Sequence, residues 1–507
     1  MQKPTTTEIA AKGGKSGMSL FLVTVFMATV AWFVWWGLGY TGFNHPFVFI
    51  LACAFGLFMA FNIGGNDVAN SFGTSVGAGT LSITQALIVA ALFEVSGALI
   101  AGKEVTDTIS KGIVDLSMID IQPMQFVFVM MSALIAAALW LLFASYKGLP
   151  VSTTHSIIGG IVGASVALGI SQHSNAAFSL VYWHKIGQIG MSWVISPVLG
   201  GIMAWIVYGQ IKKHVLMHGT VADHATYSRR VKSLRTRVHQ PMTKRISQIH
   251  SMMMLREDDG AHAPGTEAEK VLARRALRVW IPLIAMFGAL MITSMLLFKG
   301  LKNLNLGLSD TQYGLIIIVV SVAVWYVVRR YARRFRSGEV NRATYILFSW
   351  MQVVTASGFA FSHGSNDIAN AIGPFAAIMD VLRTGSIAEQ NAVPSIAMLT
   401  FGIALIVGLW FIGKEVIKTV GSNLAAMHPA SGFTAELSAA AVVMAASFMG
   451  LPVSSTHILV GAVLGIGLVN RNANWALMKP IGLAWVITLP AAAVLAVVCY
   501  LILQAVF

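Results

Sequence analysis

The segment Gly64-Gly65-Asn66-Asp67-Val68-Ala69-Asn70 occurs again 300 residues later as Gly364-Ser365-Asn366-Asp367-Ile368-Ala369-Asn370. A second motif, Gly148-Leu149-Pro150-Val151-Ser152-Thr153-Thr154-His155, recurs after 302 residues as Gly450-Leu451-Pro452-Val453-Ser454-Ser455-Thr456-His457. Each copy interrupts a long apolar stretch with carboxylate, amide and hydroxyl groups. Related polar interruptions in the two halves of a membrane chain are typical of the central binding site of a secondary transporter.

The composition is that of a membrane protein. Hydrophobic residues make up 56% of the 507 positions and charged residues 11%, with a mean hydropathy of +0.74. A soluble chain of this length needs more charge to cover its surface. Because lipid cannot satisfy exposed backbone groups, the spans are expected to be helices. The first apolar run, 19–40, is too long for a signal-peptide core and is predicted to be a retained span.

The apolar runs predict an all-α polytopic fold of roughly a dozen crossings. Helical or re-entrant elements are expected at 64–80, 151–170, 364–379 and 453–469. The predicted spans are 19–40, 46–62, 83–102, 124–146, 186–211, 279–298, 313–331, 343–362, 393–413, 434–449 and 481–504.

Basic residues predict the orientation. Residues 212–278 carry 14 Lys/Arg against 6 Asp/Glu, and 329–342 carry 6 Arg against one Glu. This clustering beside span ends follows the positive-inside rule and argues against nucleic-acid binding, despite a formal net charge of +14. The N-terminus is therefore predicted in the cytoplasm and the C-terminus outside, in a multi-pass protein of the plasma or inner membrane.

This orientation makes the two copies inverted repeats, since equivalent segments enter the membrane from opposite faces. The expected organisation is an N-terminal tail and first span (1–45), a first repeat (46–211), a basic cytoplasmic loop (212–278), a connecting hairpin with a basic segment (279–342) and a second repeat (343–507).

The first motif supplies candidate cation ligands. A carboxylate at the bilayer centre costs about 2.5–3.5 kcal/mol, so Asp67 and Asp367 are expected to face a polar cavity with a partner. Glycines allow the backbone to break and to approach a ligand closely. The asparagines Asn66, Asn70, Asn366 and Asn370 lie four residues apart within each copy, so each pair lines one helix face.

The second motif supplies candidate anion ligands. Proline followed by Ser or Thr favours a helix start, where hydroxyls and free N–H groups face outward. Such a start can bind an oxyanion without Lys or Arg. The predicted anion ligands are Ser152, Thr153, Thr154, Ser454, Ser455 and Thr456, with Asp67 and Asp367 beside them; simple helix capping is the alternative for any one hydroxyl.

Two aspartates and a dianion in one low-dielectric cavity would repel each other strongly. Cations must therefore enter with the anion, or protons must neutralise the carboxylates. Aspartate, asparagine and unwound backbone oxygens suit Na⁺, and no Cys/His spacing indicates a transition-metal site or a cofactor. Glu94 and Glu436 are further candidate acids of the ion pathway, whereas His363 stands where the first copy has Ile63 and gains no support from the repeat.

The duplicated motifs resemble those of the inorganic phosphate transporter (PiT) family over about 46–211 and 343–504. The resemblance implies inverted repeats with re-entrant hairpins, a central phosphate, flanking Na⁺ ions and a homodimer. It also supports Asp67, Asn70, Asp367 and Asn370 as site residues, and Glu94 and Glu436 as functional acids. Gly65 stands where the sodium-coupled branch often has Ala, which leaves Na⁺ or H⁺ open as the coupling ion.

The sequence thus predicts a symporter, not an enzyme, that imports inorganic phosphate with Na⁺ by alternating access. The alternatives are a proton-coupled phosphate or metal-phosphate symporter, a sulfate permease of the same fold, and a passive channel or membrane receptor.

Overall fold

The computed structural model describes residues 6–114, 121–149, 151–172, 178–216, 267–300, 307–336, 339–387, 393–413, 416–417, 428–471, 473 and 475–507. Within these residues the regular secondary structure is helical, apart from an isolated β-bridge between Val114 and Val181. Eleven helices of this described part are long and apolar enough to cross a membrane. The all-α polytopic fold predicted from the sequence is therefore confirmed.

The helix bounds follow the predicted apolar runs closely. The longer helices are α1 (Thr6–Tyr40), α2 (Pro46–Ile63), α4 (Ile83–Ala101), α6 (Pro123–Tyr146), α7 (Thr153–Gln172), α8 (Trp183–His214), α12 (Ile281–Met295), α13 (Asp310–Ala332), α14 (Val340–Asp367), α16 (Ser395–Ile412), α18 (Pro429–Phe448) and α20 (Trp475–Val506). The shorter ones are the π-helical η1 (Gly64–Val68), η3 (Ala276–Trp280) and η4 (Leu296–Gly300), with α3 (Ala69–Ala78), α5 (Lys103–Lys111), α11 (Glu267–Arg275), α15 (Ala369–Thr384) and α19 (Ser455–Asn470).

Local sequence explains several helix starts. Pro46, Pro123 and Pro429 lie in the first turn of α2, α6 and α18, where a missing N–H costs nothing. Ser82 caps α4 in a reciprocal box with Gln85. The basic loop predicted at 212–278 begins and ends in helix, because α8 continues to His214 and α11 begins at Glu267; residues 217–266 lie outside the described part.

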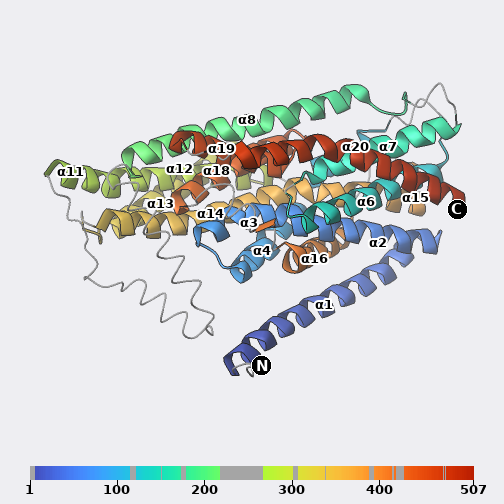
Figure 1. The fold of residues 1–507 in the computed structure, drawn as a ribbon, viewed down its shortest axis with the longest axis horizontal. Coiled ribbons are helices and arrows are strands. Elements are labelled where there is room, and N and C mark those ends of the chain that lie inside the picture. Colours follow the sequence, from blue (N-terminus) through green and yellow to red (C-terminus); the bar gives the residue numbers. More distant parts are fainter. Residues whose placement is uncertain are drawn as a thin grey trace.

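Figure 1 shows most long helices running along the longest axis of the molecule, with α1 diverging from the side of the bundle. The C-terminus lies at the end where α1 meets α2, because the rings of Phe47 and Phe507 are 5.7 Å apart. α8 ends at the opposite end of the bundle, near α11 (Figure 1). α14 is buried through its second half and carries polar residues there, which explains why it is not among the eleven apolar spans.

Glycines let two pairs of helices touch through their backbones. The first pair is α2 with its extension η1 against α16, and the second pair is α14 against α4. A Cβ on Gly64 would lie 1.7 Å from the Leu405 carbonyl oxygen, and one on Gly408 would lie 1.7 Å from that of Phe61. The second pair repeats this contact, since Gly364 faces the Glu94 carbonyl. These distances leave no room for a side chain. The motif glycines therefore serve helix packing, which differs from the predicted approach to a ligand.

Candidate functional site

The sequence suggested that the first motif breaks its helix. In the structure the helix continues through the motif. η1 connects α2 to α3 through a π-helical turn, and in the second copy only Ile368 separates α14 from α15. A π-turn widens the helix by one residue per turn and is frequent at functional sites. The backbone therefore stays helical over the described residues 60–78, and over 360–384 it is interrupted only at Ile368, so no extended unwound segment is seen in these two ranges.

Asn66 ties the first motif to the second. Its Nδ2 donates to Ser145 Oγ (3.0 Å) and to the Leu149 carbonyl (3.1 Å), and its Oδ1 accepts from the Val151 N–H (3.2 Å). Both polar atoms of this buried side chain are thus engaged within the protein.

Asn366 makes the same three bonds in the other half. Its Nδ2 donates to Ser447 Oγ (3.0 Å) and the Leu451 carbonyl (3.2 Å), and Val453 N–H donates to its Oδ1 (3.3 Å). The cation-binding role of Asn66 and Asn366 stays a prediction. Their hydrogen bonds show that each side chain also holds the loop that leads into α7 or α19.

The two aspartates face the hydroxyl motifs. Asp67 and Asp367 are 2% and 1% exposed. Thr153 donates to Asp67 Oδ2 and Thr456 to Asp67 Oδ1 (3.0 Å). Ser455 donates to Asp367 Oδ2 (2.6 Å). Since Thr456 comes from the second half, the carboxylate of the first half is held by hydroxyls from both halves.

A second link between the halves involves Asn370, whose Nδ2 lies 3.1 Å from Thr153 Oγ1 and 3.2 Å from Thr154 Oγ1. Thr154 in turn donates to the Val453 carbonyl (2.9 Å). The predicted cation ligand Asn70 begins the equivalent helix, but its side chain lies outside what the structure describes. Three of the predicted hydroxyl ligands therefore donate to an aspartate in one buried layer, and Thr154 joins this layer through Asn370.

The other two predicted hydroxyl ligands cap helices. Ser152 Oγ accepts from the His155 N–H at 3.1 Å, and Ser454 Oγ accepts from the His457 N–H at 3.3 Å. This satisfies a free amide of the first turn of α7 and of α19. The capping alternative thus describes Ser152 and Ser454, whereas the next two residues of each motif point to the aspartates or to the opposite half.

Two buried oxygens of this layer lack a donor among the described residues. Asp367 Oδ1 and Asn370 Oδ1 have no hydrogen-bond partner among the described residues. Asp67, His363 and Asp367 each offer a ligand atom, and these atoms lie within 4.8 Å of one another. A buried acceptor without a donor is costly unless a cation or a proton meets it. The carboxylate and amide oxygens of this set suit a hard cation such as Na⁺, whereas the imidazole of His363 is a type of ligand that transition metals accept.

His363 is the residue that the repeat argument missed. Its Nδ1 lies 2.7 Å from Glu94 Oε2 and its Nε2 lies 3.0 Å from Asp367 Oδ2, with all three side chains buried. Glu94 from α4 therefore reaches the aspartate layer through an imidazole. The available sequence signal was the spacing of four between His363 and Asp367, which places both on one helix face.

Glu436 forms a separate polar cluster. Its Oε1 accepts from Thr74 (2.8 Å), from Ser75 and from Gln352 Nε2 (3.2 Å), and its Oε2 accepts from Thr355 (2.9 Å). These donors come from α3 and α14, so the carboxylate on α18 joins three helices. Of the two predicted pathway acids, Glu94 thus contacts the aspartate layer through His363, and Glu436 lies in its own hydroxyl and amide cage.

Comparison with known proteins agrees with this geometry. Residues 63–496 match the model of the phosphate transporter family. A predicted phosphate permease of Mycobacterium bovis is 54% identical over 94% of this chain and 91% of its own length. Inorganic phosphate transporter 2-1, chloroplastic, of Arabidopsis thaliana is 34% identical over 88% of this chain and 70% of its own.

A solved structure described as the sodium-dependent phosphate transporter superposes with a TM-score of 0.71 at 31% identity, covering 91% of this chain and all of the other. The family match spans both pairs of motifs and the helices that carry them. This chain is therefore a multi-span membrane protein that belongs to the phosphate transporter family.

Proposed function

We propose that this protein imports inorganic phosphate by symport with Na⁺, through alternating access around the layer formed by the aspartates and the hydroxyl motifs. It moves the ions without covalent chemistry. The single observation that carries this proposal is the pair Asp67 and Asp367, buried together with an Asp367 oxygen that has no donor. Two adjacent carboxylates accept a phosphate dianion only when cations enter with it or protons neutralise them, and the proposal takes the first of these.

The hydroxyls of Thr153, Thr154, Ser455 and Thr456 bind the phosphate in this proposal. They lie in the first turns of α7 and α19, where free amides and the positive end of the helix dipole favour an anion. Binding requires these hydroxyls to turn from their present acceptors toward phosphate oxygens. Asp67, Asp367, Asn370 and Asn70 then hold the cations beside the anion, while Ser152 and Ser454 keep the helix starts in place.

In this proposal, inverted repeats over 46–211 and 343–507 provide the two conformations that alternating access requires. The matched bonds of Asn66 and Asn366 support this assignment, since three bonds recur with distances within about 0.1 Å of each other. Rocking of one repeat against the other would break the contacts that cross between the halves, such as Thr456 with Asp67. Residues 1–45 and 279–342 lie outside the repeats in this organisation.

We also propose that the N-terminus and the basic loop predicted at 212–278 lie in the cytoplasm and the C-terminus outside, with the protein in a plasma or inner membrane. This proposal rests on the charge pattern and on the opposite placement of Phe507 and the end of α8 (Figure 1). The resemblance to the family also supports a homodimer. Crosslinking of purified protein in membranes tests the dimer, and labelling of cysteines introduced at each terminus tests the orientation.

A proton-coupled phosphate symporter is the second candidate. Both ring nitrogens of His363 face carboxylate oxygens, at 2.7 and 3.0 Å. A neutral imidazole has one N–H. The Nδ1 contact with Glu94 is a hydrogen bond, whereas Nε2 has no hydrogen-bond partner among the described residues, although Asp367 Oδ2 lies 3.0 Å away. A further proton on this imidazole would therefore lie between two carboxylates. A proton held there would take the place of one cation.

The test is uptake of labelled phosphate into proteoliposomes with an inward Na⁺ gradient, a choline gradient at the same pH, and a proton gradient alone. Accumulation only with Na⁺ supports the proposal, whereas accumulation with protons alone supports the second candidate. Asp367→Asn is expected to lower uptake at least about tenfold, equivalent to ~1.4 kcal/mol of binding, while the protein remains folded. Normal uptake with unchanged Na⁺ dependence in this variant would refute the cation role.

A further inference from the structure

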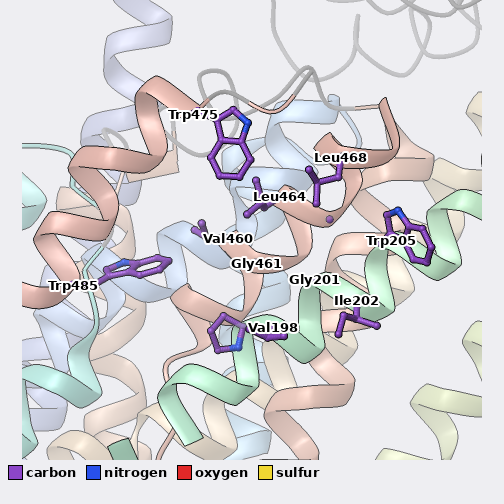
Figure 2. Close-up of a pocket in the computed structure, with 12 residues that line it drawn as sticks. Val198, Gly201, Ile202, Trp205, Val460, Gly461, Leu464, Leu468, Trp475 and Trp485 are labelled. Atoms are coloured by element: carbon purple, nitrogen blue, oxygen red, sulfur yellow. The ribbon is translucent and has the colours of Figure 1, made fainter. Parts of the chain in front are cut away.

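An apolar groove lies on the membrane-facing side of the bundle, between α8, α19 and α20 (Figure 2). Its volume is about 550 Å³, within the range of small-molecule sites. Trp475 and Leu468 lie at one end in Figure 2, Val198 lies at the other, and Trp205 and Trp485 flank it. Apart from the indole N–H groups, its side chains are hydrocarbon.

Backbone packing of α8 against α19 forms the floor of the groove. A Cβ on Gly465 would lie 2.2 Å from the Gly201 carbonyl oxygen, and one on Gly461 would lie 2.3 Å from that of Pro197. The two helices are thus in direct contact along these glycines. The larger side chains of α8 and α19 form the walls on either side of this contact. Ile202 and Trp205 on one wall are 51% and 54% exposed, so the groove opens toward lipid.

Within the described part of the chain, basic residues lie close in sequence to the lining residues at one end of the groove, Leu468 and Trp475. Lys212 near the end of α8 donates to the Val469 carbonyl on α19 (2.9 Å), which places the C-terminal ends of these helices side by side. Arg471 follows Leu468 by three residues, and the exposed Lys479 lies one helical turn after Trp475. α8, α19 and α20 contain no Asp or Glu, so no acidic side chain on these helices neutralises the cations.

We propose that this groove binds an anionic phospholipid, with an acyl chain along Ile202, Leu468 and Trp485 and its phosphate beside Arg471 and Lys479. The apolar side chains of the groove suit a hydrocarbon chain. A phosphate group suits the mouth of the groove, the end at Leu468 and Trp475, because cations near a membrane surface attract anionic lipid. Trp475 at the mouth has the amphipathic ring that favours the headgroup level.

A second copy of this chain is a poorer occupant. A symmetric dimer through this face would bring the same patch of each copy together. Lys212, Arg471 and Lys479 of one copy would then approach their counterparts without an acidic partner on these helices. The lipid assignment rests on the groove and its charges, and it does not depend on which ion drives transport.

The experiment is native mass spectrometry of the purified full-length protein after equilibration with equal amounts of phosphatidylglycerol and phosphatidylcholine of identical acyl chains. The wild type is expected to retain phosphatidylglycerol preferentially. Arg471→Gln and Lys479→Gln should each reduce that preference roughly fivefold, since each cation contributes to anionic-lipid attraction by that factor. Lys185→Gln, at the far end of α8, is the matched charge control and should change nothing.

A variant that fills the groove tests the contact of the acyl chain separately from the contact of the lipid phosphate with the cations. Ile202→Trp should abolish retention of both lipids, whereas Leu199→Trp, at an equally exposed position outside the lining, should leave it unchanged. The two charge variants are at exposed sites and keep the test valid if Ile202→Trp fails to fold. Equal retention of both lipids by the wild type would overturn the proposal. So would lipid-free dimers that Ile202→Trp dissociates, because a second copy would then occupy the groove.

Discussion

Replacing Asn66 with alanine tests whether the two sequence motifs are joined by that single side chain. The change deletes three hydrogen bonds, those to Ser145, the Leu149 carbonyl and the Val151 N–H. Val151 is fully buried, so its amide would be left without a partner in the loop that begins α7. Asn66→Ala should therefore loosen the positions of Thr153 and Thr154 as well as the helix that carries Asp67.

The magnitude follows from these contacts. Three hydrogen bonds at a net of about 1 kcal/mol each contribute about 3 kcal/mol, and a stranded buried donor adds ~1–2 kcal/mol. We expect Asn66→Ala to lower the free energy of unfolding by about 4–5 kcal/mol. Asn366→Ala deletes the matching three bonds, so its loss should agree with that of Asn66→Ala within about 1 kcal/mol.

The assay is unfolding of the purified protein in detergent micelles, followed by phosphate uptake in proteoliposomes. Asn62→Ala is the matched control, because Asn62 is equally buried one helical turn earlier and bonds only to the Phe58 carbonyl of its own helix (2.8 Å). Its loss should stay within about 1 kcal/mol. If Asn66→Ala and Asn62→Ala lose equal stability and keep equal uptake, the motif-joining role is refuted.

Three further variants test other contacts. Gly64→Ala places a Cβ 1.7 Å from the Leu405 carbonyl oxygen and should prevent folding or lower the thermal midpoint in detergent, whereas Gly39→Ala, with nothing within 4 Å, should not; equal midpoints would contradict the packing argument. His363→Ile leaves the buried Glu94 and Asp367 without their shared partner, so we expect phosphate uptake to be lost and Glu94→Gln to restore stability in that background. An additive double mutant would show that these groups act independently. Glu436→Gln replaces an acceptor that meets four donors and should cost about 1–3 kcal/mol in detergent unfolding; wild-type stability would show that the cage is not needed.

The sequence predicted the helices because their signal is local. A run of apolar residues long enough to cross a bilayer excludes most other structures, so the predicted spans agree with the described helices within a few residues at most ends. The sequence also predicted α14, as the span 343–362, although the polar second half of this helix makes it less apolar than the spans around it. The repeated motifs likewise pointed to the one layer where Asp67, Asp367 and the hydroxyls meet.

The roles of individual polar residues were harder to predict. The sequence predicted Asn66 and Asn366 as cation ligands but not their hydrogen bonds within the chain, because an asparagine beside an aspartate offers the same oxygen whether it faces an ion or an amide of its own chain. His363 was set aside because Ile63 occupies its place in the other half. Its partner Glu94 lies 269 positions away in sequence, and no spacing rule connects them.

By itself, the sequence determined that this protein spans a membrane, that its two halves carry the same pair of motifs, and which residue types form the site. Only the tertiary structure decided which of those residues meet one another, which glycines serve helix contacts, and where a lipid-facing groove opens. The physical reason is the range of the interactions. Apolar length and helix capping act between neighbours in the chain, whereas hydrogen bonds such as Thr456 to Asp67 join positions separated by 389 residues.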